Sequence, residues 1–375
     1  MGVSTAAPER IIRELLARAD VRIDGDGAGD IAVHDRRLYG RILRDGSLGL
    51  GEAYMEGWWD AEPLDEFFSK VLWANLDKRL RRGARMILRD AAHPLLNRQS
   101  RQRAFQIGVH HYDIGNDLYR AMLDGRMTYS CGYWKDARNL DEAQEAKLDM
   151  ICRKIGLSRG QSVLDIGCGW GSFARFAAER YGARLVGLTV SKEQVALGNE
   201  MCRGLPVEMR LQDYRDERGH FDHVVSIGMF EHVGDRNYRT FMRVVHRCLK
   251  SGGLFLLHTI GGNESVRATD PWITKYIFPN SMLPSAAQLA ASFEGLFVME
   301  DWHNFATDYD KTLMAWFSNF DARWNDLRGK YGDPFYRMWK YYLLSCAGAF
   351  RSRQNQLWQI VLSKGGVRGG YVSMR

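Results

Sequence analysis

The chain has 375 residues, and its 52 lysines and arginines outnumber 45 aspartates and glutamates, which gives a formal net charge of +7. A hydrophobic fraction of 45% and a charged fraction of 26% are typical of a folded protein with one large domain and a smaller one. No apolar run reaches the ~18 residues of a membrane-spanning helix, and the N-terminus, with Glu9, Arg10, Arg13 and Glu14, differs from a signal peptide. We therefore expect an intracellular protein. Its charge alone does not choose between nucleic acid and an anionic membrane as a partner.

Residues 1 to about 100 are predicted to form a mostly helical N-terminal domain. The stretch 24–27 favours a tight turn, and 31–33 has the composition of a short strand. From 64 to 88, apolar residues recur at helical spacing. The basic residues on, beside or after this stripe are Lys78, Arg79, Arg81, Arg82, Arg85, Arg89, Arg98, Arg101 and Arg103. Two interpretations stay open: a core-facing helix with a solvated basic face, which we favour, or contact with anionic lipid headgroups.

Strands and helices alternate between about residues 139 and 263, as a parallel sheet requires. A short buried strand at 162–166 leads into a glycine-rich turn and then a helix that begins at Ser172. Further strands are predicted at 184–190, 207–211, 223–227, 253–259, 297–300 and 359–363. The predicted fold class is α/β, a Rossmann-like sheet with helices on both faces.

The glycine-rich turn has the spacing GxGxG in Gly167, Gly169 and Gly171, and the preceding strand contains Asp165. Glycine lets backbone N–H groups approach a ligand closely, and turns at strand ends bind nucleotide-like cofactors in open α/β sheets. A dinucleotide fingerprint would be GxGxxG with an acid about 20 residues later, but 185–190 has no acid. The turn therefore favours S-adenosylmethionine over a nicotinamide cofactor.

A segment rich in helix breakers begins at Gly261 and Gly262 and continues through Pro271, Pro279 and Pro284. We expect a long irregular segment, as lids and binding loops often are.

The cysteines have neither CxxC pairs nor nearby histidines. They are Cys131, Cys152, Cys168, Cys202, Cys248 and Cys346. We predict no metal site and no disulfide framework from this spacing, and expect most of them to be small buried side chains.

Seven further segments carry distinctive residue combinations. They are 51–60 (GEAYMEGWWD), 110–119 (HHYDIGNDLY), 127–134 (MTYSCGYW), 228–234 (GMFEHVG), 257–261 (LHTIG), 308–316 (DYDKTLMAW) and 346–351 (CAGAFR). Together they resemble the cyclopropane-fatty-acyl-phospholipid synthase family, in the right order along nearly the whole chain. The related mycolic-acid cyclopropane synthases share the catalytic half without a comparable N-terminal domain. The resemblance therefore implies a bacterial phospholipid enzyme.

The resemblance implies two domains and a definite reaction. Residues 1–100 would form a smaller, mostly helical domain for lipid binding and dimerisation, and 101–375 a class I methyltransferase domain. The enzyme would transfer a methylene from S-adenosylmethionine across the cis double bond of an unsaturated phospholipid acyl chain and so form a cyclopropane. One alternative stays open: a related lipid methyltransferase that leaves a methyl or methylene branch.

The resemblance also implies a bound bicarbonate ion as the base that removes a proton from the transferred methyl group. The residues that would hold it are Cys131, Glu231, His258, Ile260 through its backbone, and Tyr309. Imidazole and backbone N–H groups can donate to the anion, and Tyr309 offers a hydroxyl and a π face for a cation. Cys131 or His258 taken singly would be an ordinary core residue. Cys346 is a weaker catalytic candidate, because the reaction needs no thiol nucleophile.

For S-adenosylmethionine, the resemblance implies contacts with each part of the cofactor. Tyr129 and Ser130 would hold the methionine portion. Thr189 and Gln194 would meet the ribose, and Asp213 with Tyr214 the adenine. The turn region would contribute Asp165, Gly167, Cys168, Gly169 and Gly171. Gln194 has a competing role, because Ser191 opens a capping box (SKEQ) that would use the same side chain.

As partners we expect unsaturated phospholipid acyl chains and an anionic membrane surface. The family implies a homodimer that is cytoplasmic and peripheral to the inner face of the bacterial membrane. A nucleic-acid methyltransferase is disfavoured, because 227–232 (IGMFEH) lacks the prolines of enzymes that methylate exocyclic base amines. A non-catalytic lipid-binding protein would be expected to lose the glycine-rich turn or Glu231.

Overall fold

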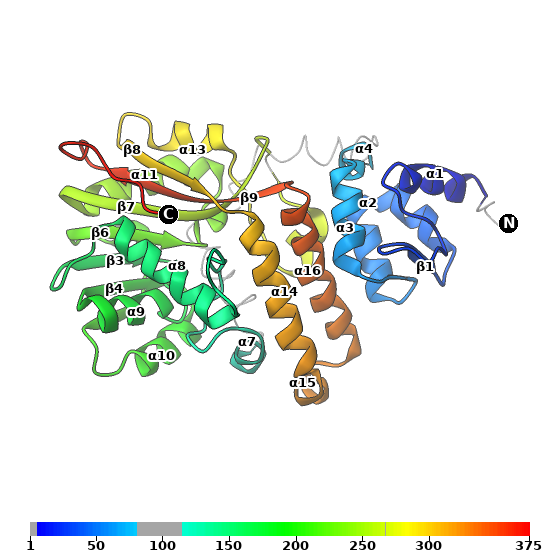
Figure 1. The fold of residues 1–375 in the computed structure, drawn as a ribbon, viewed down its shortest axis with the longest axis horizontal. Helices are drawn as coiled ribbons and strands as arrows, with labels where there is room; N and C mark the ends of the chain where they lie inside the picture. The colour runs from blue at the N-terminus through cyan, green and yellow to red at the C-terminus, as the bar shows by residue number, and fades with distance from the viewer. Residues whose placement is uncertain (1–5, 81–114, 267) are drawn as a thin grey trace. The chain divides into compact units, whose positions relative to one another are not determined.

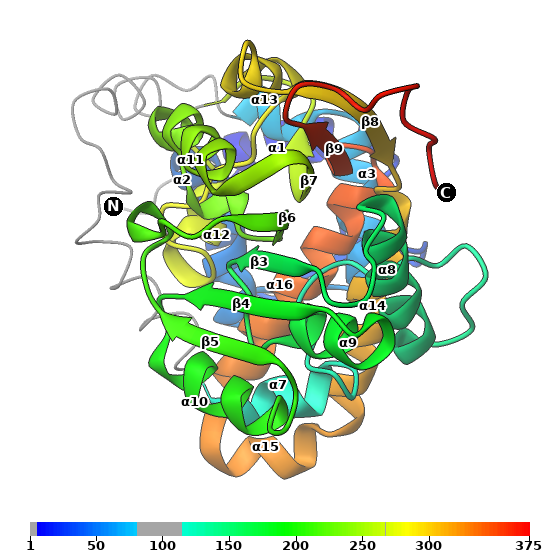
Figure 2. The same cartoon turned by 90° about the vertical axis from the view of Figure 1, so that its left-hand side faces the viewer.

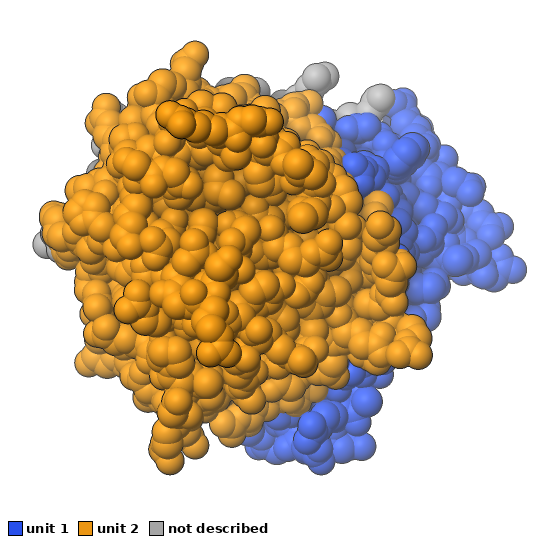
Figure 3. All heavy atoms as spheres, turned by 60° about the vertical axis from the view of Figure 1, so that its left-hand side comes forward, with its two compact units in different colours: residues 1–96, 267–279, 309–355 blue, residues 97–266, 280–308, 356–375 orange. Residues whose placement is uncertain are grey.

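The computed structural model describes residues 6–80, 115–266 and 268–375, and the chain divides into two compact units. Unit 1 comprises 1–96, 267–279 and 309–355, and unit 2 comprises 97–266, 280–308 and 356–375 (Figure 3). The predicted domains, 1–100 and 101–375, divide the chain once, whereas these units interleave along it. The roles given to those domains stay predictions. Within the described ranges, no helix is both long and apolar enough to cross a bilayer.

Unit 1 is mostly helical. Its elements are α1 (Ala6–Ala17), β1 (Ile31–Val33), α2 (Arg37–Met55), β2 (Trp59–Ala61), α3 (Leu64–Trp73), α4 (Leu76–Leu80), α12 (Pro271–Tyr276), most of α14 (Thr307–Ala322), α15 (Trp324–Tyr331) and α16 (Asp333–Arg351) (Figure 1). β1 pairs with β2, which confirms the predicted short strand. Helix α16 packs closely on α3, since a Cβ at Gly348 would lie 2.6 Å from Phe68 Cβ. Glycine at this position therefore permits the close approach of the two helices.

The helical stripe predicted over 64–88 begins as two helices, α3 and α4. Asn75 between them has a φ of +54°, a left-handed conformation that interrupts a regular helix. Trp73, at the end of α3, is 69% exposed. The basic residues from Arg81 to Arg103 lie outside the described residues, so the two interpretations of the basic stripe stay open.

Unit 2 is built on a seven-stranded sheet with the strand order β5-β4-β3-β6-β7-β9-β8 (Figure 2). The strands are β3 (Ser162–Ile166), β4 (Arg184–Thr189), β5 (Val207–Leu211), β6 (Phe221–Ile227), β7 (Leu249–Gly262), β8 (Val298–Asn304) and β9 (Asn355–Ser363). Strands β3 to β7 pair in parallel, and β8 is antiparallel to β9. The strand order reverses at β3, and open α/β sheets bind ligands outside the carboxyl ends of the strands at such a point.

Helices cover both faces of the sheet, as predicted. They include α7 (Asn116–Met122), α8 (Leu140–Lys154), α9 (Ser172–Tyr181), α10 (Lys192–Met201), α11 (Asp235–Cys248) and α13 (Ala286–Phe293), with the 3-10 turns η2 (Tyr214–Asp216) and η3 (Phe230–His232). Successive strand residues point to opposite faces. Leu164 and Val224 pack with α11 and α13, whereas Val163 and Val225 pack with α8 and α9. The alternation of apolar residues along β3 and β6 therefore builds two cores.

One segment predicted to be irregular contains a helix, α12, so that part of the prediction is wrong. The Asp270 carboxylate accepts hydrogen bonds from the N–H groups of Trp272 (2.9 Å) and Ile273 (3.2 Å). Pro271 occupies the first turn, where its missing N–H would have no helical partner anyway. A cap residue followed by proline is thus a helix start here, although proline elsewhere breaks helices.

Asp222 connects three strands of the sheet. Its carboxylate, on β6, accepts hydrogen bonds from the N–H and Oγ–H of Ser162 on β3, both 2.8 Å, and from Lys250 Nζ on β7 at 2.7 Å. Burial would raise the pKa of this carboxyl, but the Lys250 ammonium and the Ser162 donors outweigh burial and hold the pKa well below its ordinary value. The ionised carboxylate therefore stabilises the fold.

We expect Asp222→Asn to destabilise the protein at pH 7 by about 1.5–3 kcal/mol, the range for a hydrogen bond to a charged group. Because the folded-state pKa is lowered, this stabilisation is present above the unfolded-state pKa of about 4 and is lost as the pH falls through the folded value. The free energy of unfolding in urea should therefore differ less between wild type and Asp222→Asn as the pH falls below about 5. Asp136→Asn, at an exposed position of unit 2, is the control. A difference that is constant with pH would contradict the prediction.

Candidate active site

The turn after β3 is held by backbone hydrogen bonds. The N–H groups of Gly167 and Cys168 both donate to Leu188 O on β4, at 2.9 and 3.1 Å, and Gly171 N–H donates to Cys168 O at 2.9 Å. Gly167, Gly169 and Gly171 have φ values of +83°, +55° and +83°, which L side chains rarely adopt. The turn therefore needs glycine at these positions, but the amides of Gly167 and Cys168 hold the turn itself rather than point to a ligand.

The space beside the turn differs between its glycines. A Cβ built at Gly169 would meet no heavy atom within 4 Å, whereas one at Gly167 would lie 2.4 Å from Met229 Cγ. Gly167 thus lets the segment after β6 approach the turn. Gly169 borders open room at the carboxyl end of β3, where a cofactor is expected in this kind of sheet.

Ser130 lies against the end of β6 and is held by helix α8. A Cβ at Gly228 would lie 3.7 Å from Ser130 Cβ. Gln144 Nε2 donates to Ser130 O at 2.7 Å, and Lys147 Nζ donates to Ser130 Oγ at 2.9 Å. The structure thus brings Ser130, predicted to hold the methionine portion, to the strand ends near the turn.

Tyr129 and Cys131 flank Ser130 in the same segment. The ring centroids of Tyr129 and Tyr119 are 5.2 Å apart. Cys131 is fully buried, and its Sγ donates to Gly132 O at 3.0 Å. Both predicted residues therefore lie beside the end of β6, although far from it in sequence.

Gln144 and Lys147 are site neighbours that the sequence analysis does not name. They lie one helical turn apart on α8, and both are fully buried. The neighbouring residues Leu148 and Ile151 are buried too. Lysine is almost never fully buried without a partner, so a lysine on the apolar face of a predicted helix is the signal that could have found it.

Asp165, within β3, carries a buried carboxyl. It is 1% exposed, and its Oδ1 has no hydrogen-bond partner among the described residues. Burial raises its pKa to about 7, opposed by the Lys147 ammonium, which lowers it. A buried oxygen without a partner is costly unless a ligand or water pairs with it.

Thr189 and Gln194, predicted to meet the ribose, are bonded to each other. Thr189 Oγ1 donates to Gln194 Oε1 at 2.6 Å. Only half of the predicted capping box forms: Ser191 Oγ accepts from Gln194 N–H at 3.3 Å, but Ser191 N–H donates to Thr189 Oγ1 instead. The Gln194 side chain therefore belongs to the end of β4 rather than to the cap.

Asp213 and Tyr214, predicted to meet the adenine, follow β5. Asp213 is buried, and its Oδ1 accepts from Arg215 N–H at 2.9 Å, which caps η2. The Tyr214 ring packs edge-on against Phe241, with centroids 5.2 Å apart. These residues lie at the carboxyl end of the strand next to β4, as the prediction requires.

Glu231 and Ile260 are joined by a short hydrogen bond. Ile260 N–H on β7 donates to Glu231 Oε1 at 2.6 Å. Glu231 Oε2 is buried without a hydrogen-bond partner among the described residues. Burial raises the pKa of this carboxyl to about 7, whereas the Ile260 N–H acts to lower it. The Ile260 amide, predicted to bind bicarbonate, is thus engaged by Glu231 in this structure.

His258 is a buried neutral imidazole on β7. It is 1% exposed, and burial, with the charges of Lys147 and Lys154, holds its pKa well below the ordinary value. Gln359 Nε2 lies 3.3 Å from His258 Nδ1 and donates to it, so the ring proton is on Nε2. No described residue pairs with Nε2. His258 is therefore poised to donate one hydrogen bond.

Two predicted residues belong to unit 1, whereas all the others belong to unit 2. The Tyr309 ring stacks on that of Phe350, with centroids 4.6 Å apart. Cys346 is partly buried in α16, and burial raises its pKa to about 12. Its thiol is not ionised at neutral pH, which favours packing over nucleophilic catalysis.

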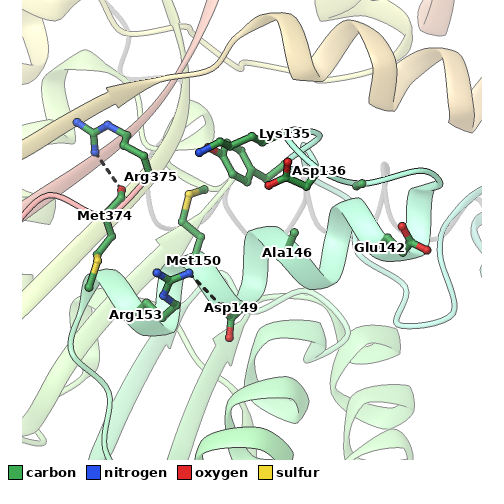
Figure 4. Close-up of a pocket in the computed structure, with 11 residues that line it drawn as sticks. Lys135, Asp136, Glu142, Ala146, Asp149, Met150, Arg153, Met374 and Arg375 are labelled. Carbon is green, nitrogen blue, oxygen red and sulfur yellow. Dashed lines mark hydrogen bonds and ion pairs between the residues drawn. The ribbon is translucent and has the colours of Figure 1, made fainter.

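A pocket of about 240 Å³ elsewhere in unit 2 contains none of the predicted residues (Figure 4). It is smaller than the ~300–1,000 Å³ of typical ligand sites. Two of its cations are already paired, Arg375 with Asp301 at 2.6 Å and Arg153 with Asp149 at 3.8 Å. We therefore do not take this pocket as the candidate site.

The residues at the strand ends fit a polar ligand. Buried polar atoms without partners in the described part of the chain include Asp165 Oδ1, Glu231 Oε2 and His258 Nε2. Open room at Gly169 lies at the same edge of the sheet. Among the described residues, no group of histidine, cysteine and acidic side chains could hold a metal ion. The arrangement suits a ligand that both accepts and donates hydrogen bonds.

Comparisons with known proteins agree on one family. A family model described as mycolic acid cyclopropane synthetase matches residues 99–360. The cyclopropane-fatty-acyl-phospholipid synthase of Escherichia coli strain K12 is 54% identical over 356 residues, which cover 95% of this chain and 93% of that protein. A probable fatty acid methyltransferase of Pseudomonas putida is 34% identical and covers 89% of this chain and 86% of that protein. A crystal structure of a mycolic acid cyclopropane synthase complexed with SAH and CTAB has a TM-score of 0.64 and 32% identity, and covers 69% of this chain and 98% of that one.

We expect Gly169→Val to weaken binding of S-adenosylhomocysteine more than tenfold, because the side chain would enter the open room beside the turn. Calorimetry measures this affinity. Gly156→Val is a matched control, since Gly156 also has a positive φ, +62°, and no heavy atom within 4 Å of a Cβ. Gly156→Val should strain the backbone about as much as Gly169→Val does, but the affinity for S-adenosylhomocysteine should not change. A folded Gly169→Val protein that binds as wild type does would remove this turn from the site.

Proposed function

This chain belongs to the mycolic acid cyclopropane synthetase family, and from this membership we propose its function. The protein is an S-adenosylmethionine-dependent enzyme that transfers a methylene group across the cis double bond of unsaturated phospholipid acyl chains. The product is a cyclopropane fatty acyl chain. The observation that carries this function is 54% identity to a cyclopropane-fatty-acyl-phospholipid synthase over 95% of the chain. That alignment extends well beyond residues 99–360, which the family model matches.

The carboxyl ends of β3, β4 and β5 would hold the cofactor. S-adenosylmethionine, when bound, supplies an electrophilic methyl group. Tyr129 and Ser130 would bind its methionine portion beside the open room at Gly169. The pair Thr189 and Gln194 would meet the ribose. The adenine would lie at the end of β5, where Asp213 and Tyr214 follow that strand.

A bicarbonate ion would be held between Glu231 and His258. Bicarbonate has one O–H donor and two further oxygens that accept hydrogen bonds. His258 Nε2–H offers a donor, and ionised Glu231 Oε2 offers an acceptor, both buried without protein partners in the described chain. Burial raises the pKa of Glu231 only to about 7, so part of the Glu231 population is still ionised at neutral pH. An accepting carboxylate raises the basicity of the ion, which would remove the proton from the transferred methyl group.

The remaining members of the proposed base site would shield it and stabilise charge. Cys131 is fully buried, and the Phe305 ring lies 5.9 Å from His258, so this side of the site is apolar. Tyr309 belongs to unit 1, so its role at this site stays a prediction from the family resemblance.

A membrane surface and a second copy of the chain are proposed as partners. The double bond of a phospholipid lies inside a bilayer, so the enzyme must dock on the cytoplasmic face of the membrane to reach it. Trp73 and Ile11 of unit 1 are 69% and 43% exposed and are the side chains that we propose to contact the membrane. A homodimer would allow one subunit to hold the membrane while the other reacts.

Product analysis tests the proposed function. The purified protein is incubated with S-adenosylmethionine, bicarbonate and vesicles of monounsaturated phospholipid, and the acyl chains are analysed by mass spectrometry and proton NMR. We expect a gain of one CH₂ together with the cyclopropane proton signal. A gain of CH₂ without that signal would show a branched-chain methyltransferase instead, and no gain in mass would refute both.

We expect Glu231→Gln to lower turnover by about a hundredfold or more, while affinity for S-adenosylhomocysteine changes no more than a few-fold. The amide oxygen can still accept from Ile260 N–H, so the fold should be retained, but the amide cannot carry the negative charge. Glu193→Gln, at an exposed position of α10, is the control. Turnover near that of wild type at saturating bicarbonate would mean that another carboxylate has this role.

A further inference from the structure

Helix α8 carries two fully buried lysines, Lys147 and Lys154, about two helical turns apart. Burial lowers the pKa of each to about 8. A buried ammonium is costly unless a carboxylate or several acceptors compensate its charge. The two lysines differ in how the protein compensates them.

Lys154 has an acidic partner. Its Nζ lies 3.6 Å from Asp301 Oδ2 and 3.1 Å from His303 Nδ1. Asp301 is itself bonded by Arg375, at the C-terminal end of the chain. Lys154 is therefore part of a closed structural network.

Lys147 has no such partner. Within the described residues, no carboxylate oxygen lies within 4.0 Å of its Nζ, and its hydrogen bond goes to the neutral hydroxyl of Ser130. Asp124 and Asp165 act on the charge of Lys147 only from beyond that distance. The fully buried ammonium therefore has one neutral acceptor and no carboxylate in contact, and a further anion near Ser130 would complete the compensation of its charge.

The hydrogen bonds of Ser130 show where that anion would lie. The Lys147 ammonium can only donate, so Ser130 Oγ accepts from it and keeps its own proton for another acceptor. Gln144 Nε2 occupies the Ser130 carbonyl at 2.7 Å. The carbonyl oxygen and the Oγ of Ser130 thus both accept from α8. The O–H of Ser130 remains as a donor, and the adjacent cation strengthens it.

We propose that Lys147 is a positioning residue that aims the Ser130 hydroxyl at the carboxylate of the cofactor's methionine portion. Lys147 acts through Ser130, because its own side chain is fully buried. The carboxylate supplies the anion that the buried ammonium lacks, and the pair of charges is completed only when the cofactor binds. This inference rests on the proposed function and adds to it the residue that selects a ligand with a carboxylate.

The test compares two ligands that differ in this carboxylate. S-adenosylhomocysteine has the amino-acid end, and 5′-methylthioadenosine lacks it. Calorimetry measures both affinities for wild type, Lys147→Met, Ser130→Ala and the control Lys154→Met. We expect Lys147→Met and Ser130→Ala each to weaken the affinity for S-adenosylhomocysteine about tenfold to a hundredfold. The affinity for 5′-methylthioadenosine should stay within about twofold of the wild-type value. The double variant should lose no more than the larger single loss, because both changes break one chain of hydrogen bonds.

Thermal unfolding separates this role from a structural one. Replacing an unpaired buried charge by an apolar side chain is neutral or stabilising, so Lys147→Met should unfold no earlier than wild type. Lys154→Met should unfold at a lower temperature than wild type, because it breaks the buried pair with Asp301. The ratio of its affinities for S-adenosylhomocysteine and 5′-methylthioadenosine should stay that of wild type.

Several results would overturn the inference. Equal losses for both ligands in Lys147→Met would show a merely structural role. Unchanged affinities together with a higher bicarbonate requirement for activity would assign the missing anion to bicarbonate. If wild type bound neither ligand, the proposed function itself would fail, and this inference with it.

Discussion

The candidate site depends on β6 and β7 remaining bonded beyond the last paired residues of the ladder, Ile227 and His258. Gly228 N–H still donates to His258 O at 2.9 Å, and Ile260 N–H then donates to the Glu231 carboxylate at 2.6 Å. The Glu231 side chain thus takes the place of the backbone carbonyl that would accept from Ile260 N–H in a regular ladder. The buried carboxylate and the imidazole are consequently held at one end of the sheet, and Ser130 packs against Gly228 at the same place.

The same region is electrostatically costly. Asp165 and Glu231 have raised pKa values, His258 a lowered one, and Lys147 is buried without a carboxylate beside it. Lys154, by contrast, is paired with Asp301. Groups left without partners at a switch point of an α/β sheet are typical of a site that a ligand completes.

Much of this site follows from local sequence. The spacing of Gly167, Gly169 and Gly171 after a short apolar strand predicts a turn at a strand end, because few other residues adopt those backbone angles. The position of Glu231 just after a predicted strand likewise predicts the carboxyl edge of the sheet. Only half of the capping box predicted at Ser191 forms. The Thr189 hydroxyl bonds both to the Gln194 side chain and to the Ser191 N–H, the two groups that the other half of the box would have joined. No sequence pattern predicts the role of Lys147. Helical spacing indicates that a residue faces inward, but it does not indicate which group of another segment the side chain will contact.

The sequence by itself determined the α/β class, the glycine-rich turn and the strand ends at which Glu231 and His258 lie, since these depend on backbone preferences and on periodicities of two and 3.6 residues. Its resemblance to a known family also indicated the chemistry. Only the tertiary structure decided that Ile260 N–H is taken by Glu231, that Thr189 bonds Gln194, and that Lys147 meets a hydroxyl rather than a carboxylate. These contacts join residues on different elements, and their hydrogen bonds and charges depend on packing that no local pattern in the sequence encodes.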